Sequence, residues 1–174
     1  MFNGKQNNTL DLIKSWLKKH DCKGPVLELG CGFGQYTTVL STIGKVTAVD
    51  ISNQMISLAK KLNSNQATQY IKSDMVSFVS ESNQNFNTIA IIYSLFHLPL
   101  NNIYNLLPDI VNHINIGGYL ILVIHEGNGV YINKKGVPYT LLSYSDISTT
   151  LQKLGCVILE TNIPIPKQNV TFDI

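Results

Sequence analysis

The sequence predicts an α/β fold with an open, doubly wound, mostly parallel sheet of seven strands. Amphipathic helical patterns alternate with short apolar segments along the chain. Residues 88–93 and 119–124 are almost continuously apolar, which is typical of strands buried on both faces. The last two strand-like segments have no helix between them. We therefore expect an antiparallel hairpin at the C-terminal edge of the sheet.

The N-terminal segment predicts one amphipathic helix. Thr9 can act as its N-cap, and the basic residues 18–20 suit the negative end of the helix dipole. The Gly24-Pro25 step then interrupts the chain. We expect residues 1–24 to form a helix that is available as a lid, and residues 25–174 to complete a single domain.

The remaining elements follow from hydrophobic periodicity and from residues that cap helices. Ser52 and Ser145 are the expected N-caps of two helices, and Gly117-Gly118 is the expected stop of another. Residues 126–142 are rich in glycine and lysine and predict a loop. The predicted strands are 26–29, 45–49, 69–72, 88–93, 119–124, 156–163 and 169–174, and the predicted helices are 35–43, 52–62 (with Met55, Ala59 and Leu62 on one face), 75–79, 101–115 and 145–154.

The charge of the chain is small and evenly spread. The net charge is +2, and all 13 basic residues are lysines that form no dense cluster. Proteins that hold nucleic acid by its phosphates usually carry a denser basic stripe, and arginine is the residue that contacts phosphate in a bidentate way. A nucleic-acid substrate is therefore disfavoured.

Hydropathy and cysteine content narrow the class of protein further. No apolar run approaches the roughly 20 residues that cross a bilayer, and the first ten residues contain no apolar signal core. We expect a cytoplasmic protein without a membrane partner. Cys22, Cys31 and Cys156 are odd in number and far apart. Their spacing predicts neither a zinc site nor a disulfide framework, so no metal is expected.

The most informative segment is the glycine-rich loop that follows the first predicted strand, where a doubly wound sheet binds nucleotide-like ligands. Its glycines are Gly30, Gly32 and Gly34. The dinucleotide-binding fingerprint requires its third glycine one residue later, where this chain has Gln35. Glu28 also lies two residues before the first glycine, and a carboxylate there suits a cationic amino-acid ligand better than a pyrophosphate.

The pattern of Glu28, Gly30, Gly32 and Gly34 resembles motif I of the class I, Rossmann-like methyltransferases. This resemblance implies that the loop, with Cys31, binds S-adenosyl-L-methionine as cofactor. It also implies the class I methyltransferase fold. The similarity covers roughly residues 25–163 and extends to the branch of bacterial small-molecule methyltransferases.

Further motifs of the family follow in the expected order. Asp50 ends the second predicted strand, twenty residues after Gly30, and in the family this acid accepts both ribose hydroxyls. Ile51 is expected to pack on adenine. Asp74 and Met75 resemble the motif in which a side chain and a backbone N–H recognise the adenine edge, although an acid at this place can also be a helix cap.

The segment after the fourth predicted strand resembles the part of the family that lies beside the methionyl group of the cofactor. Its expected cofactor contacts are Ser94 and Leu95. His97 is the candidate catalytic residue because an imidazole can accept a proton near neutral pH, but a structural role is an alternative. The family usually has an acid where this chain has Asn87.

The expected activity is methyl transfer to an unidentified acceptor, which the small size of the chain predicts to be a small molecule. One alternative is an inactive homologue that binds S-adenosylmethionine as a partner or sensor. A nicotinamide-dependent oxidoreductase is another, since Tyr131 and Lys135 have the spacing of a dehydrogenase pair. The loop spacing argues against it, and we interpret this pair as chance. The oligomeric state is left open.

Overall fold

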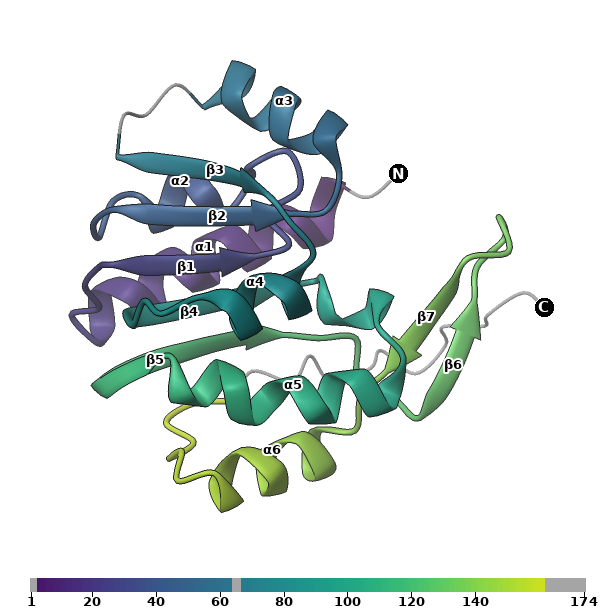
Figure 1. Cartoon of the computed structure of the whole chain (residues 1–174). Coiled ribbons are helices and arrows are strands. Elements are labelled where there is room, and N and C mark those ends of the chain that lie inside the picture. Colours follow the sequence, from purple (N-terminus) through teal and green to yellow (C-terminus); the bar gives the residue numbers. More distant parts are fainter. Residues whose placement is uncertain (1–2, 64–66, 162–174) are drawn as a thin grey trace.

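The computed structural model describes residues 3–63 and 67–161, with side chains from Thr9 onward. Its centre is a sheet of five parallel strands in the order β3-β2-β1-β4-β5 (Figure 1). The order reverses between β1 and β4, which is the point where open α/β sheets bind ligands. The strands are β1 (Val26–Leu29), β2 (Val46–Asp50), β3 (Thr68–Lys72), β4 (Phe86–Ile92) and β5 (Ile114–Val123).

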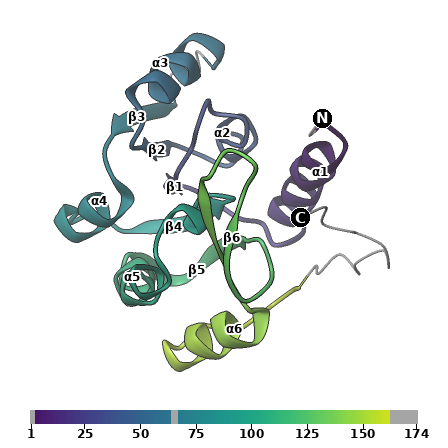
Figure 2. The same cartoon turned by 90° about the vertical axis from the view of Figure 1, so that its right-hand side faces the viewer.

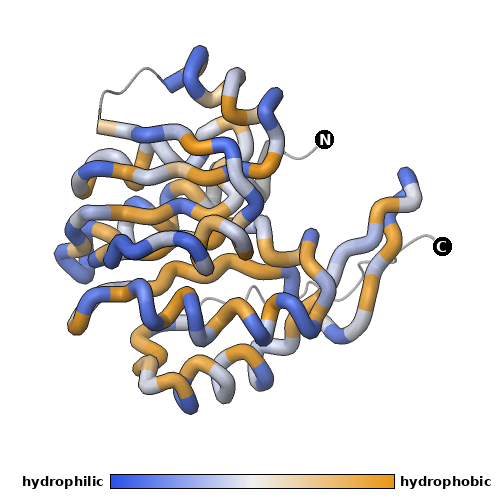
Figure 3. Tube along the Cα trace, in the orientation of Figure 1, coloured by the Kyte–Doolittle hydropathy of each residue, from blue (hydrophilic) through white to orange (hydrophobic). Residues whose placement is uncertain are grey.

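Helices cover both faces of the sheet (Figure 2). One layer consists of α1 (Asn3–Lys19), α2 (Thr37–Leu40) and α3 (Asn53–Leu62), and the other of α4 (Met75–Glu81), α5 (Leu100–Asn112) and α6 (Tyr144–Lys153). Successive side chains of β1 point to opposite faces of the sheet. Val26 belongs to the core between the sheet and helices α1 to α3, and Leu27 belongs to the core between the sheet and helices α4 to α6. Apolar residues consequently predominate along the central strands, with few polar residues between them (Figure 3).

The predicted α/β class and the parallel, doubly wound sheet are confirmed, and the first five predicted strands are present. Ser52 is the N-cap of α3, and its hydroxyl accepts a hydrogen bond from Met55 N at 3.3 Å. The buried stripe of α3 differs from the expected one. Ile56 and Ala59 are buried, whereas Met55 and Leu62 are exposed, because α3 contacts β2 and β3 through the stripe of Ile56.

The seven-stranded sheet is not confirmed. Residues 156–161 of the predicted sixth strand form no strand, and the predicted strand 169–174 lies outside the described residues. An antiparallel hairpin exists, but it forms a separate two-stranded sheet where a loop was predicted. Its strands are β6 (Gly129–Ile132) and β7 (Pro138–Leu141). They extend away from the carboxyl edge of the main sheet (Figure 1).

A turn explains why the predicted loop is a hairpin. Asn133 Oδ1 accepts hydrogen bonds from Lys135 N and Val137 N, and Gly136 has a φ of +75°. These contacts reverse the chain between β6 and β7. The glycine and lysine content that predicted a loop thus belongs mainly to the tight turn and to the solvent-exposed strand β6.

Several predicted helix ends are wrong. The first helix begins at Asn3, so Thr9 lies inside it, and its hydroxyl is hydrogen-bonded to Tyr93 instead of to a helix terminus. Ser143 caps α6, because its hydroxyl accepts from Asp146 N at 3.4 Å, so Ser145 is a residue of the helix. α2 is limited to four residues of the predicted segment 35–43.

The predicted stop of α5 is also wrong. The helix ends at Asn112, and Gly117-Gly118 lie within β5. The register of β5 against β4 shifts between Phe86 and Thr88, because β5 contains additional residues there, next to the two glycines.

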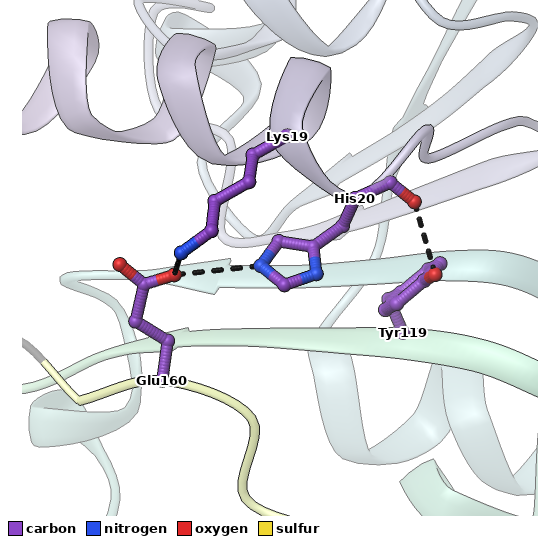
Figure 4. Close-up of polar contacts among 4 residues, drawn as sticks. All are labelled: Lys19, His20, Tyr119 and Glu160. Carbon is purple, nitrogen blue, oxygen red and sulfur yellow. Dashed lines mark hydrogen bonds and ion pairs between the residues drawn. The ribbon is translucent and has the colours of Figure 1, made fainter.

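The C-terminal end of α1 is joined to β5 and to the segment that follows α6 (Figure 4). Lys19 Nζ lies 2.9 Å from Glu160 Oε2, and His20 Nε2 lies 3.4 Å from the same oxygen. Tyr119 OH donates to the backbone oxygen of His20 at 3.0 Å. Since Ile13 is also buried, this part of α1 belongs to the core. No helix among the described residues combines the length and apolar character that a bilayer span requires.

Candidate functional site

The glycine loop leaves β1 at the carboxyl edge of the sheet, beside the switch point. The backbone N–H groups of Gly30 and Cys31 donate to Val49 O at 2.8 and 3.0 Å, which joins the loop to β2. Gly30 has a φ of +77°, and a Cβ at this position would lie 2.3 Å from Ser94 Cβ. At Gly32, with a φ of +55°, nothing lies within 4 Å of an added Cβ. The loop is therefore packed at Gly30 and open at Gly32.

Cys31 and Gly34 support the loop from the core. Cys31 is buried, and its neighbours include the carboxyl groups of Glu28 and Asp50, whose charges add to burial in raising the pKa of the thiol. Gly34 is buried, and an added Cβ would lie 2.4 Å from Asn63 Nδ2. Both residues shape the turn, and of the three glycines only Gly32 borders open space.

Asp50 ends β2 beside the loop. Its Oδ2 accepts from Gly32 N and its Oδ1 accepts from Ser52 N, both at 2.8 Å. One bond comes from the glycine loop and the other from the residue that caps α3, and together they hold the carboxylate in one orientation. The Asp50 side chain is thus a rigid acceptor at the edge of the loop.

Glu28 lies in the middle of β1 and is only 1% exposed. Thr37 Oγ1 donates to its Oε2, while its Oε1 has no hydrogen-bond partner among the described residues. The pKa of Glu28 is raised to about 8, mainly by burial; the hydrogen bond from Thr37 lowers it and the charge of Asp50 raises it by smaller amounts. The site therefore contains a buried carboxyl group that holds its proton at neutral pH.

The predicted adenine contacts lie at the same edge. Ile51 follows Asp50 and is 68% exposed, so its apolar side chain is available to a ligand. Met75 begins α4, and its Cε lies 3.7 Å from the position of a Cβ built on Gly30. Asp74 is the N-cap of α4, with Oδ1 accepting from Val76 N at 2.8 Å. The structure thus shows the helix-cap alternative for the Asp74 side chain.

The segment after β4 meets the glycine loop. Ser94 is buried, and its hydroxyl donates to Leu29 O at 2.7 Å, which holds the ends of β4 and β1 together. Leu95 is 1% exposed, so its side chain belongs to the core and only its backbone is available to a ligand. His97 is exposed at the surface, and the pKa of its imidazole is lowered from the ordinary value because partial burial of the ring outweighs the opposing charge of Asp50. The imidazole is consequently neutral at neutral pH.

The sequence reasoning missed three residues of this region. Thr37 holds the buried carboxyl group of Glu28 through its hydroxyl. Tyr93 directly follows β4 with a φ of +51°, and its hydroxyl lies 3.1 Å from Thr9 Oγ1. Tyr139 of β7 places its ring 4.7 Å from that of Phe96, centroid to centroid. Two short segments of residues that favour strands, 130–132 and 139–141, flank turn residues that include Asn133 and Gly136, and this pattern is the signal that would have predicted Tyr139 on a strand of a hairpin.

Possible metal ligands do not cluster in the described part of the chain. Within it, no group of three or more His, Cys, Asp and Glu residues is arranged to hold an ion. The three cysteines are free thiols. Burial raises the pKa of Cys22 to about 11, with Asp21 adding to the rise.

The strand order, the glycine loop at the switch point and the acid at the end of β2 together define the fold of the class I methyltransferases. A sequence family described as a methyltransferase domain matches residues 26–118, just over half of the chain. The protein belongs to this family. A search of curated protein sequences finds no significant match.

Solved structures of methyltransferases share the fold. The complex of DhpI with S-adenosylhomocysteine has a TM-score of 0.72 and 18% identity, over 88% of this chain and 78% of that chain. Magnesium protoporphyrin IX methyltransferase (ChlM) from Synechocystis PCC 6803 with bound S-adenosylmethionine has a TM-score of 0.70 and 20% identity, over 91% and 72%. The glycopeptide N-methyltransferase MtfA has a TM-score of 0.65 and 17% identity, over 88% and 81%.

The DhpI and ChlM structures contain the demethylated product and the cofactor, respectively, that the sequence motifs predict for this chain. Their acceptors differ, since one acts on a magnesium porphyrin and another on a glycopeptide. The narrower resemblance to bacterial small-molecule methyltransferases is therefore not confirmed.

Proposed function

We propose that the protein is an S-adenosylmethionine-dependent methyltransferase with a small-molecule acceptor. The observation that carries this proposal is the pair of carboxyl groups beside the glycine loop. Asp50 has both oxygens held by backbone N–H groups, and Glu28 is buried with one oxygen unpartnered. Neither forms an ion pair within the described residues. A cationic nucleoside is the ligand that satisfies both.

Asp50 suits a ribose. An ionised carboxylate has about four acceptor positions, and Gly32 N and Ser52 N use one on each oxygen. The remaining positions match two adjacent hydroxyl groups, and the fixed orientation lowers the entropy cost of binding them. We assign the exposed side chain of Ile51 and the residues Asp74 and Met75 to the adenine end of the same ligand.

Glu28 suits the amino-acid end. A buried carboxyl group without a cation is costly when ionised, so it keeps its proton until a positive charge arrives. The ammonium group of a methionyl moiety supplies that charge. The backbone of Gly30, Cys31, Gly32 and Gly34 and the backbone at Ser94 and Leu95 would line this end, because Ser94 contacts Gly30 in the folded chain.

When bound, S-adenosylmethionine supplies a methyl group whose bond to sulfur breaks, with its electrons going to sulfur, as an acceptor atom bonds to the carbon. The protein has to hold the acceptor in line and receive a proton if the acceptor loses one. His97 is the proposed proton acceptor, since its imidazole is neutral at neutral pH and lies close enough to Asp50 for that charge to act on the pKa of the ring. Its test is a loss of rate in H97Q without a loss of cofactor affinity.

The acceptor site is proposed at the ends of β4 and β5, where the hairpin and the N-terminal part of α1 are the nearby segments. The hairpin adds only a short arm, which favours a small acceptor over a macromolecule. The described lysines form no basic stripe, so nucleic acid stays disfavoured. No observation favours an inactive binding module or a nicotinamide-dependent enzyme.

Calorimetric titration with S-adenosylhomocysteine tests the proposal. Binding is expected, and Asp50→Asn should weaken it about 10- to 100-fold, because charge-assisted hydrogen bonds to the ribose are lost. Asp109→Asn, an exposed position on α5, is the matched control and should bind like the wild type. Thermal stabilisation by NAD but not by S-adenosylhomocysteine would overturn the proposal in favour of an oxidoreductase. Binding without methyl transfer to any of a broad acceptor panel would support the inactive alternative.

A further inference from the structure

Six rings form a continuous series of contacts at the carboxyl ends of β4 and β5 and on the hairpin. The ring centroids lie 5.2 Å apart for Tyr93 and His125, 4.9 Å for Phe96 and His125, and 4.2 Å for Phe96 and His97. Tyr139 lies 4.7 Å from Phe96, 5.5 Å from His97 and 6.4 Å from Tyr131. We call this set the aromatic platform: Tyr93, Phe96, His97, His125, Tyr131 and Tyr139.

The aromatic platform is at the surface, and only Tyr93 among its six rings packs against a hydrophobic core. His97 and His125 are exposed, Tyr131 is 41% exposed, and Phe96 and Tyr139 are half-buried. None of the six belongs to the fully buried residues of the two hydrophobic clusters. The register of the hairpin explains the pairing of Tyr131 with Tyr139, but it does not bring Phe96, His97 and His125 to the same place. Rings gathered at a surface beside a binding loop are a feature of ligand sites.

The hairpin part of the platform is held in place at its base. Thr140 Oγ1 donates to Leu98 O at 2.6 Å, which joins β7 to the turn that carries Phe96 and His97. Leu142, the next residue but one, is 1% exposed and is packed in the core. Asn133 Nδ2 donates to Tyr139 OH at 3.1 Å. The rings are therefore ordered before any ligand arrives.

The platform adjoins the proposed cofactor site. Phe96 follows Ser94 by two residues, and Ser94 Cβ would contact a side chain at Gly30. His97 is close enough to Asp50 for the charge of that carboxylate to act on its pKa. The platform consequently begins where an acceptor atom has to meet the transferred methyl group.

We infer that the aromatic platform binds a flat aromatic ring of the methyl acceptor, an inference that rests on the proposed function. Ring pairs prefer offset or edge-to-face geometry, and Tyr139 already stands edge-on to Phe96 at 83° and to His97 at 70°. A planar acceptor can add to such a set on a face or an edge with closer ring contact than a puckered aliphatic ring allows. Four of the six rings carry no charge, and His97 is neutral, so a neutral aromatic acceptor suits them better than an anionic one.

Two small-molecule probes that each carry two adjacent hydroxyl groups test whether the aromatic platform requires a flat ring. Catechol and trans-1,2-cyclohexanediol carry the same two hydroxyl groups on a flat and on a puckered ring. Saturation-transfer NMR with the protein loaded with S-adenosylhomocysteine measures the contact of each, and 2-naphthol is added as a larger flat probe. Catechol or 2-naphthol should give a signal about fivefold above that of cyclohexanediol, since a ring pair favours the flat probe by roughly that factor.

Substitutions then test whether the flat probe binds at the aromatic platform. Tyr139→Leu and Phe96→Leu remove a ring but keep apolar volume, and each should lower the flat-probe signal about fivefold. Tyr139→Phe keeps the ring and should retain the signal. Tyr104→Leu on α5 removes a half-buried tyrosine outside the platform and is the control. S-adenosylhomocysteine affinity, unchanged in all four, reports that the variants are folded.

The outcomes distinguish the two proposals. Equal signals from flat and puckered probes, absence of flat-probe binding, or an unchanged signal in both leucine variants would overturn the platform as an aromatic site while leaving cofactor binding intact. Failure of the wild-type protein to bind S-adenosylhomocysteine would overturn the proposed function, and the acceptor proposal with it.

Discussion

The two halves of the carboxyl edge are built in different ways. At the ends of β1 and β2, the side chains of Glu28 and Asp50 are held by hydrogen bonds over short stretches of chain, from Thr37, Gly32 and Ser52. At the ends of β4 and β5, the aromatic platform is held by ring contacts between segments that lie up to about forty residues apart, such as Phe96 and Tyr139.

The difference between these halves agrees with the two ligands that we propose for them. A cofactor shared by a family needs the same few hydrogen bonds in every member, and a local motif supplies them wherever the sheet forms. An acceptor that varies between members needs a surface that can change without disturbing the sheet. An appended hairpin with side chains outside both cores meets that need.

The largest effect on stability is expected at Glu28, in the half of the edge formed by the ends of β1 and β2. Its pKa is raised to about 8 from an ordinary value of 4.5 by burial. Below pH 4.5 both the folded and the unfolded chain hold the proton, so no stability is lost. Between these two values the unfolded chain releases the proton and the folded chain keeps it. The free energy of unfolding should therefore fall as the pH rises, by on the order of 4 kcal/mol.

Urea unfolding of the cofactor-free protein from pH 5 to pH 8 measures this fall. Glu28→Gln keeps a neutral group of the same shape and should remove the fall, while Glu81→Gln, an exposed position on α4, should leave it in place. Calorimetry of S-adenosylmethionine binding in two buffers should also detect proton release in the wild type and none in E28Q. Parallel pH profiles for the wild type and E28Q would contradict the assignment of Glu28.

A second contrast lies within the glycine loop. Gly30→Ala combines an unfavourable φ with a Cβ 2.3 Å from Ser94, so a loss of about 2–5 kcal/mol in the free energy of unfolding is expected. Gly32→Ala meets open space and should lose only the backbone cost, about 1–2 kcal/mol. Urea unfolding compares the two variants. Equal losses would mean that the close approach of Ser94 to Gly30 is not maintained in solution.

The smallest of these effects is expected at the base of the hairpin. Thr140→Val removes the hydrogen bond to Leu98 O with little change of shape, and should cost about 1 kcal/mol in stability. The flat-probe signal at the aromatic platform should fall, while S-adenosylhomocysteine affinity stays unchanged. Thr149→Val, an exposed position on α6, is the control. A loss of cofactor affinity in T140V would mean that the two halves of the edge are coupled.

Sequence periodicity predicted most of the sheet because its strands are buried on both faces, and a short, continuous apolar run between turn residues is typical of such a strand. Hydrophobic periodicity did not predict where the helices begin and end. Thr9 and Ser145 have the chemistry of N-caps, but the chain uses one for a contact with Tyr93 and places the other inside a helix. A cap depends on where the helix begins, and packing against the sheet decides that point.

By itself, the sequence determined the α/β class and the loop of Gly30, Gly32 and Gly34 with Asp50, because these depend on contacts between residues near one another in the chain. Only the tertiary structure decided that Glu28 is buried with a free oxygen, that residues 126–142 form a hairpin, and that Tyr139 reaches Phe96. Burial and ring contact are properties of segments brought together by folding, and no spacing along the chain reports them.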